Sequence, residues 1–276
     1  MSDDSSTGPV NVGILTIGNE VLNGLVLDTN ANWLDAHIAS LGLQVIRHAT
    51  VRDILEEIGK GIDFLSETCQ VIITSGGLGP TFDDMTLEAV AKHLGLELKE
   101  NREAMQIIER QYRLLYELGI VDSPVMNEPR RKMGIIPEES IPLNNEVGGA
   151  PGVMLTVDQF TLICLPGVPK ELKFIFQNSV LPWLIQQTDL KYKEEIVDFP
   201  LRDETVMAPH ISKVMNMNNG VYIKSMPKSY GSSPVLRVWI STRGKDEDEL
   251  LSTIHKTIKD LESESGLKSK PPTSEK

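Results

Sequence analysis

The sequence has few cysteines, and they show none of the spacings that organise cysteines into a structural site. Cys69 and Cys164 are the two cysteines among 276 residues, and neither belongs to a CxxC motif or lies near a histidine cluster. Disulfide scaffolds and zinc modules both depend on such patterns. The two thiols are therefore expected to be reduced and buried in the core.

Long hydrophobic runs are also missing. No uninterrupted apolar run approaches the ~18 residues that a membrane-spanning helix needs. Residues 1–9 are acidic and Ser-rich, without the basic and apolar regions of a signal peptide. We expect a cytoplasmic protein without a membrane partner, and a disordered N-terminal tail over residues 1–10.

Positive charge is scarce. The 27 Lys and Arg residues are outnumbered by 39 Asp and Glu residues, which gives a formal net charge of -12. Such a chain repels nucleic acids at long range, so no nucleic-acid partner is expected. Any phosphate that it binds must be held by local backbone amides, by a metal or by a few cationic side chains. The hydrophobic content of 40% supports a full core.

Apolar periodicity predicts alternating strands and helices in an α/β domain over residues 11–188. This order requires crossover connections, and it predicts a mostly parallel sheet with helices on both faces. A Pro-, Gly- and Asn-rich stretch over residues 119–152 is expected to be irregular and to cover a site. The expected strands are 12–17, 43–51, 70–74, 153–157 and 160–165, with a tight turn at Asp158 and Gln159 between the last two, and the expected helices are 29–41, 54–65, 87–94 and 102–118.

A small C-terminal α/β domain is expected over residues 189–265, where the pattern reads strand, helix, strand, strand, helix. Its element order is loosely KH-like, but its charges are mixed and it has no clear clamp loop between paired helices. RNA binding is therefore only a weak alternative. The polar residues 266–276 are expected to form a disordered tail.

The most informative segment is a glycine turn between a buried strand and a helix. Gly76, Gly77 and Gly79 let backbone amides approach a bulky anion, and the following helix adds its positive end. Asp83 and Asp84 then supply the oxygen ligands that a diphosphate-bound divalent cation prefers. Such turns are also common in α/β proteins, and an Asp at a helix start is most often an N-cap. The lack of a Lys after the glycines argues against an ordinary P-loop.

Three further segments are expected at the same edge of the sheet, where open α/β sheets bind ligands. Glu20 can bind a ribose hydroxyl or a metal-bound water, or it can be an exposed loop carboxylate. Asp53 can be a ligand-binding residue at this edge, or it can simply cap the next helix in a capping box. Pro166 and Gly167, followed by Glu171, come directly after an expected strand, and the proline alone can serve to end that strand.

Together these segments resemble the MoaB/MogA-like molybdopterin-binding fold, and more closely the N-terminal part of the CinA family. The resemblance covers residues 11–188, and the smaller unit after it looks like the second domain of CinA proteins. The matching stretches are Gly18-Asn19-Glu20 with Asn30, Gly-Gly-Leu-Gly-Pro-Thr-x-Asp-Asp-x-Thr at 76–86, Asn127-Glu128, Gly148-Gly149-Ala150-Pro151-Gly152, and Leu165-Pro166-Gly167-Val168-Pro169-Lys170-Glu171.

The resemblance implies a three-layer α/β/α core and metal-dependent hydrolysis of a nucleotide diphosphate such as ADP-ribose, with FAD-like dinucleotides as related substrates. It also implies a divalent cation, either Mg, Mn, Co or Ni, and a homo-oligomer. Longer CinA proteins continue into a deamidase domain that this sequence lacks, so no deamidase activity is expected. Position 19 is Asn where many relatives of the fold have Asp, which removes one potential metal ligand but leaves Glu20.

The resulting hypothesis places a diphosphate and a metal on the glycine turn. The amides of residues 76–79 and the hydroxyl of Thr81 are expected to hold the diphosphate. Asp84, assisted by Asp83 or Asp53, is expected to place the cation across it. Such a cation neutralises the charge that develops during hydrolysis.

A carboxylate beside the diphosphate is expected to orient the attacking water, giving AMP and ribose 5-phosphate. Glu20 and Glu171 are equal candidates for this role. The remaining candidate substrate-binding residues are Gly18, Asn30, Leu78, Gly148, Gly149, Pro166 and Gly167.

Two other functions stay open. One is a nucleotidyltransferase that adenylates molybdopterin, because related members of the fold use equivalent glycine and Asp positions for that chemistry. The other is a non-catalytic nucleotide-binding protein in which the ligand controls assembly. The CinA-type sequence of the glycine motif, Gly-Gly-Leu-Gly-Pro-Thr, and the presence of the second domain favour hydrolysis over the transfer reaction.

Overall fold

The structure is a computed structural model of the chain, and it describes residues 10–157, 159–226 and 235–272. The chain forms two compact units that divide after Thr188. Within the described ranges, no helix is long and apolar enough to cross a membrane. Residues 1–9 of the expected N-terminal tail, and Asp158 of the expected turn, lie outside the described residues.

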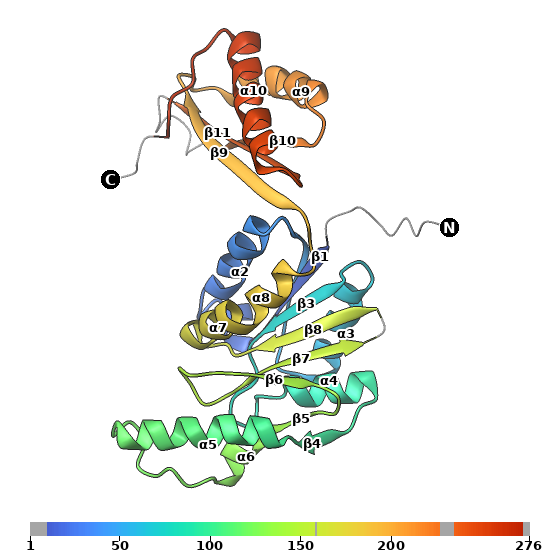
Figure 1. The fold of residues 1–276 in the computed structure, drawn as a ribbon, viewed down its shortest axis with the longest axis vertical. Helices are drawn as coiled ribbons and strands as arrows, with labels where there is room; N and C mark the ends of the chain where they lie inside the picture. The colour runs from blue at the N-terminus through green and yellow to red at the C-terminus, as the bar shows by residue number, and fades with distance from the viewer. Residues whose placement is uncertain (1–9, 158, 227–234, 273–276) are drawn as a thin grey trace. The chain divides into compact units, whose positions relative to one another are not determined.

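A six-stranded sheet organises the first unit (Figure 1). Its strands are β1 (Asn11–Ile17), β2 (Gln44–Val51), β3 (Val71–Ser75), β6 (Ile141–Leu143), β7 (Gly152–Val157) and β8 (Phe160–Leu165). The strand order is β2-β1-β3-β8-β7-β6, with parallel pairing from β2 to β8 and antiparallel pairing from β8 to β6. The mostly parallel sheet expected from the sequence is confirmed.

The central strands are buried on both faces, as strands covered by helices on each side must be. Every residue of β3 is buried, and so is every residue of β1 after Asn11. Edge strand β2 instead alternates between exposed and half-buried residues. The apolar runs of β1 and β3 therefore place these two strands at the centre of the sheet. Because they pair in parallel, their carboxyl ends lie at the same edge.

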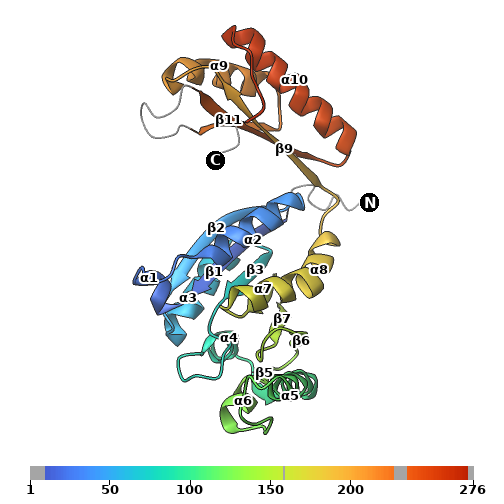
Figure 2. The ribbon, with the colours of Figure 1, turned by 90° about the vertical axis from the view of Figure 1, so that its left-hand side faces the viewer.

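Helices cover both faces of this sheet, which confirms the three-layer arrangement (Figures 1 and 2). Helices α2, α7 and α8 lie on one face, and α3 and α4 lie on the other. The helices of the unit are α1 (Asn19–Leu22), α2 (Thr29–Ser40), α3 (Leu55–Ser66), α4 (Thr86–Leu94), α5 (Arg102–Glu117), α6 (Glu128–Lys132), α7 (Pro169–Ile175), the π-helical turn η1 (Phe176–Val180) and α8 (Leu181–Ile185). Cys69 and Cys164 are free and buried, as expected.

The two helix-cap roles considered for aspartates are wrong. Helix α3 begins at Leu55 after Ile54, which makes no side-chain cap bond. Asp53 Oδ2 instead accepts a hydrogen bond from Asn19 N at 2.8 Å, so Asp53 is tied to the loop after β1. Helix α4 follows Met85, and Asp83 therefore does not cap it. Both carboxylates are left for other roles.

The stretch 119–152 was expected to be irregular, and this is wrong in part. It contains α6, β6 and a short strand β5 (Ile135–Pro137), which pairs with β4 (Leu98–Glu100). Asn127 caps α6 by accepting a hydrogen bond from Arg130 N at 3.1 Å. Elements of three to five residues complete too few periods to be read from an apolar pattern.

The second unit is a three-stranded antiparallel sheet in the order β10-β11-β9, with two helices packed on it. Its elements follow the expected order of strand, helix, strand, strand, helix. They are β9 (Lys191–Phe199), α9 (Glu204–Met217), β10 (Val221–Met226), β11 (Leu236–Gly244) and α10 (Glu247–Ser265).

The prediction of a disordered tail from residue 266 onward is wrong for the part of the tail that the structure describes. Lys270 forms a β-bridge with Asp198, in which each backbone N–H donates to the other residue's carbonyl at 2.9 Å. Ser269 N also donates to Glu262 Oε1 at 2.9 Å. This pairing could not be predicted from the polar sequence of the tail, because backbone hydrogen bonds do not depend on a particular side chain. Residues 273–276 lie outside the described ranges.

Candidate functional site

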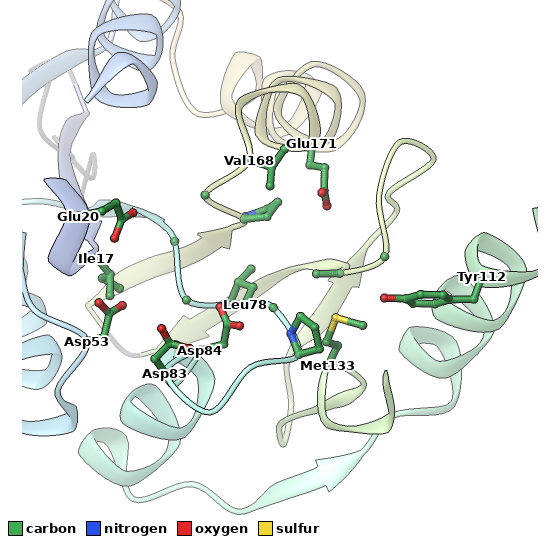
Figure 3. A pocket seen from close by; sticks show the side chains of 18 residues that line it. Ile17, Glu20, Asp53, Leu78, Asp83, Asp84, Tyr112, Met133, Val168 and Glu171 are labelled. Atoms are coloured by element: carbon green, nitrogen blue, oxygen red, sulfur yellow. The ribbon is translucent and has the colours of Figure 1, made fainter. Parts of the chain in front are cut away.

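A pocket of about 470 Å³ opens in the first unit where the parallel strands end (Figure 3). Ile17 is the last residue of β1, Gly76 follows β3 directly, and Pro166 follows β8 directly. Open α/β sheets bind ligands at this edge. The lining residues are Ile17, Glu20, Asp53, Gly76, Gly77, Leu78, Gly79, Pro80, Asp83, Asp84, Tyr112, Met133, Gly149, Ala150, Pro166, Gly167, Val168 and Glu171.

The glycine turn has a backbone that other residues cannot adopt without strain. Gly76 has φ 113° and Gly77 has φ 70°, both in the region that favours glycine. A Cβ at Gly76 would overlap the carbonyl oxygen of Ile17, and one at Gly77 would overlap the hydroxyl of Thr86. That hydroxyl donates to Gly76 O at 2.8 Å and so holds the turn against helix α4.

Three amides of this turn are available to a ligand. Among the described residues, the N–H groups of Gly77, Leu78 and Gly79 donate to no other group. Gly76 N, which was expected to join them, donates to Leu165 O at 3.0 Å and is therefore committed to the sheet edge. Consecutive free amides at a turn form a concavity suited to an anion.

Acidic side chains from three segments border the same turn. Glu20, Asp53, Asp83 and Asp84 all line the pocket, and Figure 3 shows them across it from Tyr112. The pKa of Asp83 is lowered, first because the Thr81 hydroxyl donates to its carboxylate and then by a backbone hydrogen bond. Asp83 is therefore ionised across the neutral pH range.

Thr81 serves the carboxylates and lies outside the residues that line the pocket. Its N–H donates to Asp84 Oδ2 at 2.8 Å, and its hydroxyl lies 2.7 Å from the same oxygen and also contacts Asp83 Oδ1. The Thr81 hydroxyl, predicted to hold a diphosphate, is engaged by these two aspartates. Thr81 instead fixes the direction of both aspartates.

The carboxylates do not form a metal cage of their own. Among the described residues, no group of three or more His, Cys, Asp or Glu side chains is gathered closely enough to hold an ion. Magnesium and similar cations are often held by one or two carboxylates together with substrate phosphates and water. Asp84 and Asp83, beside three free amides, fit that kind of site and do not fit a structural metal centre.

Glu171 enters the pocket from α7 and is fixed by a buried amide. Asn145 Nδ2 donates to Glu171 Oε2 at 2.7 Å and to Ala150 O at 2.7 Å, while Asn145 Oδ1 accepts from the N–H groups of Val147 and Gly148 at 3.0 Å. Burial raises the pKa of Glu171, and the hydrogen bond from Asn145 offsets part of the increase. Glu171 therefore keeps its proton to higher pH than a glutamate with the ordinary pKa does.

Four residues predicted for the site do not line the pocket itself. They are Gly18, Asn30, Thr81 and Gly148. Asn30 Nδ2 donates to Ser75 Oγ at 3.0 Å and to Gly167 O at 2.8 Å, which ties the ends of β3 and β8 together. A Cβ at Gly148 would overlap the carboxyl group of Glu171, so this glycine makes room for that side chain.

Several lining residues were not predicted from the sequence. Tyr112 lies on the apolar face of α5, and the helical spacing of that face predicts a core residue. The sequence therefore does not indicate that Tyr112 lines a site. Asn145, which fixes Glu171 without lining the pocket, was also not predicted, although an Asn three residues before Gly148-Gly149 is a recognisable turn signal. The other unpredicted lining residues are Ile17, Pro80, Met133, Ala150 and Val168.

Comparison with known proteins agrees with this geometry. The family model described as "Probable molybdopterin binding domain" matches residues 13–186. The crystal structure of CinA from Thermoplasma acidophilum, described as a protein with unknown function, is 36% identical, covers 64% of this chain and 98% of its own, and superposes with a TM-score of 0.57. The chain belongs to the CinA family, within the molybdopterin-binding-like fold.

Other relatives of this CinA-family chain match it over most of its length. Protein SSO0103 of Saccharolobus solfataricus is 35% identical over 245 residues, which cover 88% of this chain and 87% of the relative. Protein Ta0487 of Thermoplasma acidophilum is 35% identical over 249 residues, which cover 90% and 93%. The resemblance based on the glycine motif and its neighbouring segments is therefore confirmed, and the matches to these two relatives are longer than the first unit alone.

Proposed function

We propose that this CinA-family chain is a metal-dependent hydrolase of nucleotide diphosphates, which splits ADP-ribose or an FAD-like dinucleotide into AMP and a phosphorylated partner. One observation carries the proposal. The unpartnered amides of residues 77–79 and the carboxylates of Asp53, Asp83 and Asp84 line one pocket at the end of the parallel strands. The amides can bind the diphosphate oxygens, and the carboxylates can hold the divalent cation that balances the negative charge.

The residues of the pocket divide the work of binding. The amides of Gly77, Leu78 and Gly79 donate hydrogen bonds to the diphosphate oxygens, and Gly77 and Gly79 have no Cβ atoms to keep a phosphate away. Asp84, with Asp83 beside it, would hold the divalent cation. When bound, this cation neutralises the negative charge that develops on the phosphates during hydrolysis.

Glu171 is the general base in this proposal. Its carboxyl lies in the pocket, its direction is fixed by Asn145, and its pKa is raised by burial. A carboxylate whose pKa is shifted toward neutral pH accepts a proton from water more effectively than one with an ordinary pKa. Glu20 is exposed and therefore suits contact with a ribose hydroxyl.

Release of AMP is the direct test. We expect AMP from ADP-ribose, FAD or both when the protein is incubated with each of Mg, Mn, Co and Ni, with NAD and ATP as further substrates in the panel. Asp84→Asn and Asp53→Asn are each expected to lower turnover about 10- to 100-fold, as loss of groups around a catalytic metal does. Full metal-dependent turnover in both variants would show that the assignment of the carboxylates is wrong.

A second candidate is transfer of a nucleotide to molybdopterin, which the description of the matching family model favours. Hydrolysis and transfer would use the same diphosphate-binding turn, and they differ in the acceptor. Incubation with ATP and molybdopterin would give an adenylated product in one case, whereas ADP-ribose and water alone give AMP in the other. Nucleotide binding without any product across the metal panel would instead support a non-catalytic binding protein.

A further inference from the structure

One end of the pocket is chemically unlike the rest. Tyr112, Met133, Gly149 and Ala150 line it, and none of them carries a charge. In Figure 3, Tyr112 and Met133 lie across the pocket from Asp53 and Glu20, and the Tyr112 ring points its hydroxyl toward the interior. Among the described residues, no side chain or backbone group is hydrogen-bonded to this hydroxyl. These residues therefore give the end an apolar surface and one available hydroxyl, and the carboxylate of Glu171, which shares the Asn145 amide group with Ala150 O, borders it.

The Tyr112 ring is held in place from its outer side. The Arg130 guanidinium lies 3.8 Å from the ring centroid, within the range of a cation–π interaction. Arg130 Nη1 also donates to Ser123 O at 2.8 Å and to Val125 O at 2.7 Å, so the guanidinium is itself fixed. The hydroxyl of Tyr112 is thus presented to the pocket by a ring that cannot swing freely.

Gly149 lets the backbone approach the Tyr112 ring closely. A Cβ at Gly149 would lie 2.9 Å from Tyr112 Cε2 and 3.0 Å from Tyr112 Oη, closer than side chains normally pack. Gly149 therefore packs directly against the tyrosine ring, and a side chain there would displace the ring from this end, which the buried Met133 also lines. Ligand sites commonly combine such apolar walls with a few polar groups that fix orientation.

We propose that the end of the pocket formed by Tyr112, Met133 and Gly149 binds the nucleobase of the substrate. A nucleobase has flat apolar faces and polar edges, which match the apolar wall and the single hydroxyl. Tyr112 Oη hydrogen-bonds the polar edge of the base, and Met133 packs against its face. The inference rests on the proposed function, because it assumes that the diphosphate lies on the glycine turn.

Binding of ADP and of inorganic diphosphate separates the base from the phosphates. With Mg present, we expect Tyr112→Phe to weaken ADP about 2- to 10-fold, the usual effect of losing one hydrogen bond, and to leave inorganic diphosphate unchanged. Tyr116→Phe is the matched control, since Tyr116 lies one turn along α5, is exposed and does not line the pocket. Gly149→Ala is expected to act like Tyr112→Phe by displacing the Tyr112 ring and its hydroxyl.

The outcomes distinguish this inference from the proposed function. If diphosphate binds but ADP binds no more tightly, or if neither variant changes ADP binding, the nucleobase site is wrong and the hydrolase proposal stands. If both ligands weaken equally in Tyr112→Phe, the hydroxyl acts on the phosphate site and the inference is also wrong. If the unaltered protein binds neither ligand, the proposed function fails as well. Isothermal titration calorimetry gives each of these results without turnover.

Discussion

Asn145 Nδ2 donates a hydrogen bond to Glu171 Oε2 at 2.7 Å, and Asn145 is fully buried. All of the hydrogen-bonding groups of the Asn145 side chain are directed at this carboxylate or at the backbone of residues 147–150. One side chain therefore shapes the loop over the pocket and fixes the group proposed as the base. Glu171 was predicted from the sequence, and its partner was not.

The effect of Asn145 on Glu171 predicts a shift in pH dependence. In Asn145→Asp, the amide donor is lost and a second carboxyl group is placed beside Glu171, so the pKa of Glu171 rises further. Because the proposed base acts in its ionised form, the acidic limb of the pH–rate profile should move to higher pH, while activity well above the limb recovers.

The neighbouring substitution Asn144→Asp is the control for this shift. Asn144 is only partly buried, and its amide does not reach Glu171. A profile for Asn145→Asp that falls equally at every pH, without movement of the limb, would mean that Asn145 has a purely structural role.

Glu171 also predicts how stability depends on pH. Burial raises its folded pKa above the ordinary value of 4.5, so the unfolded chain loses this proton at lower pH than the folded protein does. Unfolding then releases a proton in the range between the two values, and the stability of the protein falls as pH rises through that range. Glu171→Gln removes this term. The free energy of unfolding of the variant relative to the unaltered protein should therefore increase from pH 4.5 upward and then become constant.

Urea denaturation of both proteins at a series of pH values measures this difference. Glu20→Gln is the control, because Glu20 is an exposed carboxylate of the same pocket. A stability difference between Glu171→Gln and the unaltered protein that stays flat with pH would show that Glu171 has no raised pKa in the folded state.

The sequence predicted the parallel sheet and its ligand-binding edge well, and the reason is physical. The fully apolar β3 and the glycines that follow it specify a buried strand and a tight turn locally. The partners of each polar group depend on contacts distant in sequence. The bonds from Asn19 to Asp53 and from Asn145 to Glu171 join segments 34 and 26 residues apart, and no local pattern encodes them. The position of Asp53 at the sheet edge was therefore predicted correctly, whereas its predicted role as a helix N-cap was wrong.

Lys132 predicts an effect on binding through the loop that carries the aspartates. Its ammonium group donates to Thr81 O, and Thr81 in turn positions Asp84. Lys132→Met removes this link between α6 and the loop, so KM for the nucleotide should rise about 2- to 10-fold. Steady-state kinetics provide the measurement.

Arg131→Met is the matched control for Lys132→Met. Arg131 lies on the same helix, is exposed and pairs with Glu100 at 3.3 Å, away from the pocket. Equal kinetic changes in the two variants would indicate a general loss of α6 and contradict a specific role for Lys132.

The glycine turn predicts a large difference between two Gly→Ala substitutions. Gly76 and Gly95 both have positive φ, but a Cβ at Gly76 meets the carbonyl oxygen of Ile17, whereas one at Gly95 has open space around it. Gly95→Ala should cost only the backbone strain of ~1–3 kcal/mol. Gly76→Ala should lower the free energy of unfolding by at least about 2 kcal/mol more, because a steric clash is added. Urea denaturation of both variants checks this, and equal losses would contradict the clash.

The absence of a metal cage among the described residues predicts that metal and diphosphate bind together. Asp84 and Asp83 alone give a divalent cation too few ligands, so Mg alone should raise the melting temperature very little. Mg with inorganic diphosphate should raise it clearly, because a ligand that binds the folded state stabilises it in proportion to its affinity. Asp84→Asn should abolish the difference between diphosphate with Mg and diphosphate with a chelator. If Mg alone gives the full increase, the protein holds the metal without the substrate, and the carboxylates form a structural site that the glycine turn does not complete.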